Sequence, residues 1–210
     1  MLEAWGSFED RRKENEGSVR TSKEQSKRLA LHYAYYASQT VQSVCDACTQ
    51  HWLNGDFVSF SLTGRLIVEY AASIHYILAV LSRAEDDDNW TKGHERIAHL
   101  ALGGRRPYWL EPFQIEQPKS VNILTRIKQW SSQNASAEDD YAFISEVCHP
   151  NHLQHYYFFK AGKAGDLGTS IVTEHQIKVA LERLVSIVQN STISIGDNLE
   201  KIIASVRRAP

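Results

Sequence analysis

The sequence of 210 residues has few cysteines and almost no excess charge, and each shortage excludes a class of protein. Three cysteines are too few for the disulfide framework of a small secreted domain. A formal net charge of −2 gives no strong field that would attract the whole molecule to nucleic acid or to a membrane. Residues 1–28 are charged and contain no apolar run, so no signal peptide is recognised there. We therefore expect a cytoplasmic protein without membrane contact.

Complete metal-binding motifs built from cysteine or histidine are also missing. Cys45-x-x-Cys48 falls on the apolar face of an expected helix, which favours two buried core thiols. His94 and His99 are separated by five positions, whereas a zinc site on one helix needs histidines four positions apart. At the observed spacing the two rings point in different directions. We reject a zinc site on this helix.

Two further motifs are incomplete. Glu146-x-x-His149 has the spacing found in di-iron helical bundles, but those sites need a second such pair, which the chain lacks. The glycines of residues 162–168 lack the Gly-Lys-Ser/Thr ending of a phosphate-binding loop. The sequence therefore predicts neither a metal nor a cofactor.

What the sequence does contain is one long apolar stretch, from Phe57 to Leu81, which we expect to be the central helix of the fold. Asp56 precedes it as an N-cap. Apolar residues cover most of its circumference, which is typical of a helix buried in a bundle. Its only charged residues, Arg65 and Glu69, argue against a membrane span. Because buried charges are costly unless they are paired and hydrogen-bonded, this pair predicts an inward-facing polar site.

The remaining periodicity predicts an all-α fold, a bundle of five to six helices. The flanking helices are expected at about 21–53, 90–102, 119–130, a short stretch ending at residue 150, and from 173 to about 206. Residues 1–20 are predicted to form a flexible arm, and residues 21–210 a single helical domain. Residues 105–118 should form a proline-rich loop, and residues 155–173 fit either a small β-hairpin or an ordered loop.

Two of these helices carry specific expectations. A capping box at Thr21 and Glu24 predicts the start of the first long helix. In the helix at 119–130, Val121, Leu124 and Ile127 are expected to face the core. The inner stripe of the first long helix is predicted to comprise Ala30, Ala34, Ala37, Val41, Cys45, Cys48 and Trp52.

A second polar element ends the short helix that precedes Pro150. It reads Tyr141-x-x-x-Ser145-Glu146-x-x-His149-Pro150-Asn151. The helix C-terminus and the nearby Glu146 both favour the charged form of His149. Because Pro150 ends the helix, the side chain of Asn151 is free to bond open carbonyls or to point into a cleft. This element is the natural partner for the buried charges of the central helix.

The pair Arg65-x-x-x-Glu69, followed by this second element, resembles a widespread group of bacterial helical proteins. Some of these are similar to the HEPN superfamily of helical bundles. The resemblance in layout covers residues 30–205. It implies a bundle of four or five helices, frequent homodimers, and roles in toxin–antitoxin or antiviral defence systems. The nuclease motif of that superfamily, an arginine followed by a histidine after four to six residues, is absent from this sequence.

Two functions are compatible with these residues. The first is an interaction module that binds a second copy or another protein, with an internal Arg/Glu/His network that fixes helix register. The alternative is a metal-independent RNA-cleaving or other phosphodiesterase-type enzyme. In that enzyme His149 acts as general acid/base, Arg65 holds a phosphate, and Glu69 or Glu146 orients the charged partner. The accompanying binding residues are predicted to be Tyr76, Ser145 and Asn151.

Overall fold

The computed structural model describes residues 19–103, 119–149 and 174–207, which form six α-helices and contain no strand. The helices are α2 (Val19–Leu53), α3 (Phe57–Asp86), α4 (Trp90–Leu102), α5 (Ile123–Trp130), α6 (Ala137–Cys148) and α8 (Glu174–Arg207). The all-α prediction is therefore confirmed for this part of the chain. The predicted loop at 105–118, the alternatives at 155–173 and residues 1–18 of the predicted arm lie outside the described residues.

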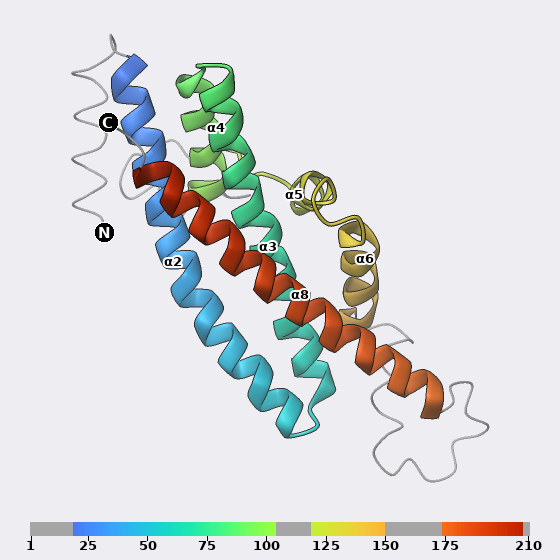
Figure 1. Ribbon diagram of the computed structural model, residues 1–210. Coiled ribbons are helices and arrows are strands. Elements are labelled where there is room, and N and C mark those ends of the chain that lie inside the picture. The colour runs from blue at the N-terminus through green and yellow to red at the C-terminus, as the bar shows by residue number, and fades with distance from the viewer. Residues whose placement is uncertain (1–18, 104–118, 150–173, 208–210) are drawn as a thin grey trace.

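The central element is α3, as predicted, because it contacts each of the other five described helices. It runs antiparallel to α2, and α8 crosses both of them obliquely (Figure 1). The helix α4 packs against α2 and α3, while α5 and α6 contact α3 and each other. The segment that ends at residue 149 is thereby placed against the charged part of α3.

The start of α3 follows the sequence prediction. The side chain of Asp56 caps the helix by accepting a hydrogen bond from the backbone N–H of Ser59 at 3.1 Å. Every residue from 71 to 77 is buried, whereas Leu62 and Leu66 in the first half are 49% and 40% exposed. By length and composition α3 could cross a membrane, but 67% of its most apolar window is buried among the other helices, as in the core helix of a bundle.

A glycine sets the crossing of α8 over α3. A Cβ atom added at Gly64 would lie 2.7 Å from Cγ2 of Val188 and 3.4 Å from Cδ1 of Ile144. The first distance is too short for two carbon atoms, since their optimal separation is about 3.5–4.0 Å. The missing side chain therefore allows α8 to approach the backbone of α3 directly.

Two predictions about α2 are wrong. The helix begins at Val19, so Thr21 lies within its first turn instead of capping it. Trp52 is 39% exposed, although Ala30 to Val41 and Cys48 of the same stripe are buried. The indole contacts the rings of Phe57 and Phe60 at 5.6 and 5.1 Å, but α2 ends at Leu53 and its last turn is not fully covered.

The prediction for α5 is partly wrong. The helix begins at Ile123 and not at residue 119, because the side chain of Asn122 caps it by accepting from the backbone N–H of Leu124 at 3.0 Å. Ile127 and Trp130 are buried, but Leu124 is 61% exposed. Leu124 points about 90° away from the direction midway between Ile127 and Trp130 on a regular helix, and this explains its exposure.

Candidate functional site

The predicted charge pair is formed on the first half of α3. Nε of Arg65 donates to Oε1 of Glu69 at 3.1 Å, and the two side chains are 31% and 28% exposed. The partner from α6 is Tyr141, whose hydroxyl accepts from a terminal nitrogen of Arg65 at 3.2 Å and donates to Oε1 of Glu69 at 3.3 Å. The Arg65 guanidinium also lies 5.6 Å from the centre of the Tyr141 ring. The three side chains thus satisfy one another and join α6 to α3.

The electrostatics of this cluster follow from its position between solvent and core. Burial opposes the charge of Arg65, but the bonds with Tyr141 and Glu69 outweigh burial, and the pKa of Arg65 is raised. Cys148 lies within the influence of both charges. Burial raises the pKa of the Cys148 thiol to about 11, with Arg65 lowering it and Glu69 raising it by smaller amounts. Cys148 is therefore a neutral core thiol at physiological pH.

His149 and Glu146, two other predicted site residues, are exposed on α6. His149 is the exposed C-cap of α6, and its backbone N–H donates to the carbonyl of Ser145 at 3.0 Å. Among the described residues, the hydrogen bonds of the Arg65 guanidinium go to Glu69 and Tyr141 and not to His149. Glu146 is exposed on the same helix.

The structure places Tyr76 on another part of α3 than Arg65. Tyr76 is buried in the second half of α3 and lies about 16 Å from Arg65 along the helix axis, at 1.5 Å per residue. Ser145 faces inward, and its hydroxyl is buried without a hydrogen-bond partner in the described part of the chain. Asn151 lies outside the described residues.

Sequence reasoning missed a second polar cluster one turn further along α3. The hydroxyl of Ser73 donates to the backbone carbonyl of Glu69 at 2.6 Å and accepts a short hydrogen bond from Arg126 of α5. Tyr33 of α2 lies beside both side chains. Burial raises the pKa of the Tyr33 hydroxyl, although its interactions with Ser73 and Arg126 partly oppose this effect. A signal was present in the sequence, since Arg126 precedes the buried Trp130 by four residues and so shares its helix face.

The Arg126 guanidinium lacks the partners that the other buried charges have. Its Nε atom is buried and has no hydrogen-bond partner among the described residues. Within the same part of the chain Arg126 forms no ion pair, whereas Arg65 pairs with Glu69. We call Arg65, Glu69 and Ser73, with Tyr141, Arg126 and Tyr33 packed on them, the polar seam of α3.

A buried histidine lies beyond the polar seam. His75 is 2% exposed, and neither ring nitrogen makes a hydrogen bond of normal geometry in the described structure. Burial lowers the pKa of His75, and the charge of Lys201 lowers it further, while neighbouring polar groups of Gln129 and Gln133 oppose the shift. His75 is therefore a neutral core residue at physiological pH.

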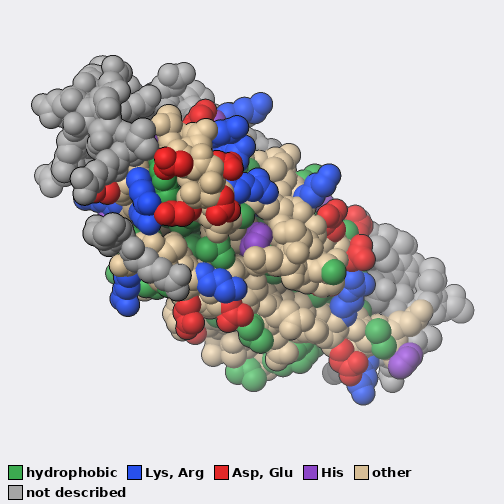
Figure 2. Space-filling view, turned by 45° about the horizontal axis from the view of Figure 1, so that its top comes forward, with side chains coloured by type: hydrophobic (Ala, Val, Ile, Leu, Met, Phe, Trp, Pro, Cys, Tyr) green, Lys and Arg blue, Asp and Glu red, His purple; other side chains and the backbone are tan. Residues whose placement is uncertain are grey.

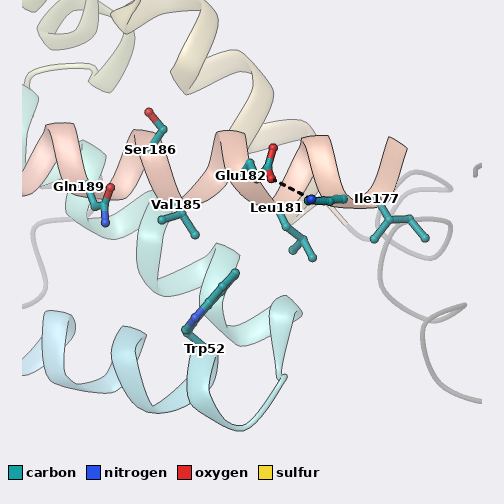
Figure 3. A pocket seen from close by; sticks show the side chains of 8 residues that line it. Trp52, Ile177, Leu181, Glu182, Val185, Ser186 and Gln189 are labelled. Atoms are coloured by element: carbon teal, nitrogen blue, oxygen red, sulfur yellow. Dashed lines mark ion pairs between the residues drawn. The ribbon is translucent and has the colours of Figure 1, made fainter. Parts of the chain in front are cut away.

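An apolar groove lies on the described structure away from the polar seam. It encloses about 530 Å³ between the end of α2 and the first turns of α8. Figure 3 shows the Trp52 ring rising from α2 toward Leu181 and Val185 of α8. The lining residues are Trp52, Ile177, Lys178, Leu181, Glu182, Val185, Ser186 and Gln189.

The described residues contain no group of three or more histidine, cysteine, aspartate or glutamate side chains placed to hold a metal ion. Comparison of the chain with protein-family models, with curated proteins and with solved structures found no match. Two physical features of the molecule are therefore the basis for assigning a function: the polar seam of α3 and the apolar groove between α2 and α8.

Proposed function

We propose that this chain is a helical interaction module that forms a homodimer through the apolar groove and acts in a bacterial defence or toxin–antitoxin type system. The observation that carries the interaction role is the groove itself. An open apolar groove beside a tryptophan that is 39% exposed is typical of a contact surface. Covering this apolar surface by association removes it from water, which is favourable. The defence role is supported by the motif resemblance alone.

The shape of the groove favours a helix as its occupant. Ile177, Leu181 and Val185 are spaced four residues apart, so they form one continuous ridge along α8. Trp52 of α2 forms the opposite wall. A groove with one helical ridge and an aromatic wall suits the apolar ridge of another helix, which packs by ridge-into-groove contacts.

A second copy of the same chain supplies such a ridge. In a two-fold dimer the ridge of each α8 enters the groove of the other copy, so one closed interface covers both grooves. The rim presents little charge repulsion, because Lys178 and Glu182 pair within one chain at 3.8 Å. The net charge of −2 per chain is also small. Self-association is thus compatible with the electrostatics of the surface.

The polar cluster on α3 has a structural role in this proposal. Arg65, Glu69 and Tyr141 fix the register of α6 against α3, and α8 packs on the same helix. The RNA-cleaving alternative has less support, since the hydrogen bonds of the Arg65 guanidinium among the described residues go to Glu69 and Tyr141 and not to His149. Acidic and basic side chains are intermixed on the face seen in Figure 2, whereas a nucleic-acid footprint is basic.

Light scattering coupled to size-exclusion chromatography tests the dimer. We expect a concentration-dependent dimer for the wild type, and monomers for Trp52→Ala and Ile177→Glu. Ile193→Glu is the matched control, because Ile193 is 63% exposed on the same helix and does not line the groove. Circular dichroism verifies that all three variants remain helical. A wild-type monomer at every accessible concentration, or a dimer unaffected by both groove variants, contradicts the proposal.

The defence role needs a separate experiment. Bacteria that express the chain are compared with vector controls for growth and for phage plating efficiency. The proposal expects a change in one of these properties that is lost in the Trp52→Ala variant. Identical growth and plating for wild type and vector removes this part of the proposal and leaves the dimer untouched.

A further inference from the structure

We propose that Arg126, together with Ser73 and Tyr33, forms a binding site for a small oxyanion, a phosphate or carboxylate group, at the end of the polar seam that contains Ser73. The site is independent of the groove and of the dimer. The inference starts from one observation: the Arg126 guanidinium is partly buried, yet its Nε atom has no acceptor and its charge has no carboxylate partner among the described residues.

The hydrogen-bond directions show that Ser73 does not neutralise this arginine. The single proton of the Ser73 hydroxyl is donated to the carbonyl of Glu69 at 2.6 Å, so the Ser73 oxygen accepts from Arg126. This bond orients one terminal nitrogen of the guanidinium and provides no negative charge. Ser73 therefore positions Arg126 and leaves its remaining donors available.

Within residues 19–103, 119–149 and 174–207, neighbouring charges do not compensate Arg126 either. Oε1 of Glu69 accepts from both Arg65 and Tyr141, so the one carboxylate of the polar seam is shared with another arginine. Two cations and one anion leave the seam with one positive charge in excess. Keeping such a charge partly away from water costs free energy, and a bound anion would offset that cost.

The available donors define the class of ligand. Nε and the adjacent terminal nitrogen of a guanidinium form a planar fork that matches two oxygens of a phosphate or a carboxylate. Tyr33 lies beside Arg126 and interacts with Ser73, so its hydroxyl helps to hold Ser73 and the guanidinium in place, and the guanidinium supplies the donors for the anion. A lysine at position 126 would provide charge without the fork.

Binding is tested by calorimetric titration and by thermal melting of the full chain with sodium phosphate and, in a second arm, sodium acetate. Sodium chloride at equal ionic strength is the reference. We expect one of the two oxyanions to raise the melting temperature beyond chloride, and the arm that responds identifies the group. Arg126→Gln should weaken binding by about tenfold to a hundredfold. Arg126→Lys and Tyr33→Phe should each have a smaller effect.

Arg183→Gln is the matched control, since Arg183 is an exposed arginine that pairs with Asp140 elsewhere on the surface. This variant should bind the anion as the wild type does. If Arg126→Gln does not fold, the Nε–H resonance of Arg126 in the wild type provides a second measurement and should shift during the phosphate or acetate titration. Absence of any response beyond chloride, or an equal response in Arg126→Gln, overturns the site.

Discussion

Arg65 on α3 and Arg126 on α5 have similar surroundings but different partners. Each lies beside a tyrosine and is partly buried against α3. Arg65 shares Glu69 and Tyr141 in a closed set of hydrogen bonds, whereas Arg126 bonds Ser73 and its Nε–H has no acceptor in the described part of the chain. The comparison distinguishes a charge that stabilises the fold from a charge that remains able to bind a ligand. A charge with a structural role, such as that of Arg65, is paired with an opposite charge inside the fold. A partly buried charge without such a pair lowers the stability of the folded state.

The sharpest way to break this comparison is to replace each arginine by methionine. Arg65→Met leaves Glu69 partly buried without its cation, so we expect a loss of about 2 kcal/mol in the free energy of unfolding. Arg126→Met removes an uncompensated charge and should be roughly neutral or slightly stabilising. Urea denaturation of both variants measures the difference. Equal destabilisation by the two changes would show that Arg126 is also a structural charge.

A smaller effect isolates the hydroxyl that closes the first cluster. Tyr141→Phe keeps the ring but removes the bonds to Arg65 and Glu69, and we expect a loss of about 1 kcal/mol in unfolding free energy. Combined with Arg65→Met, the loss should be less than the sum of the two single losses, because both changes remove the same bond. Tyr35→Phe serves as control, since Tyr35 is 59% exposed. Full additivity would argue against a shared network.

The buried half of α3 should respond to acid through His75. Its pKa is lowered in the folded protein from the ordinary value of 6.5, so the unfolded chain binds the proton more readily. The stability linked to His75 is therefore complete above pH 6.5 and falls as the pH drops toward the folded pKa. Melting temperatures measured across this range should decline less steeply in His75→Leu. Parallel curves for the two proteins would exclude this contribution.

The smallest expected effect concerns thiol reactivity beside Arg65. Because burial raises the pKa of Cys148 to about 11, iodoacetamide at pH 8 should modify it slowly. Cys45, which is only half-buried, should react first. Mass spectrometry of the labelled peptides gives the order. Arg65→Met, by removing the one charge that lowers the Cys148 pKa, should slow the reaction of this thiol further, provided that the fold is intact.

The helices were largely predictable from sequence, because apolar periodicity and capping residues are local properties. Asp56 caps α3 as predicted, and the pairing of Arg65 with Glu69 follows from their spacing. The segment before Pro150 does supply the partner of this pair, but through Tyr141 and not through His149. That choice depends on the rotation of α6 against α3, which its own sequence does not determine.

The features that carry the proposals were less accessible to sequence reasoning. Trp52 continues an inner stripe and is predicted to be buried, and only the tertiary position of α8 shows that a groove remains beside it. Arg126 resembles an ordinary surface charge on a short amphipathic helix. Its significance depends on packing against Ser73, more than fifty positions earlier in the chain. Contacts of that sequence separation are set by the whole fold.

Because Gly64 has no side chain, α8 crosses α3 closely at this point, and the crossing divides the long final helix into two parts. One arm of α8, with Ile177 and Val185, borders the groove, and the other continues past Ile195. Any side chain at this position would press on Val188 and force it, or the whole helix, outward. A tilt of α8 about this crossing would widen or narrow the groove several turns away. In the proposed dimer, a methyl group added at Gly64 would therefore change the strength of self-association although position 64 does not line the groove.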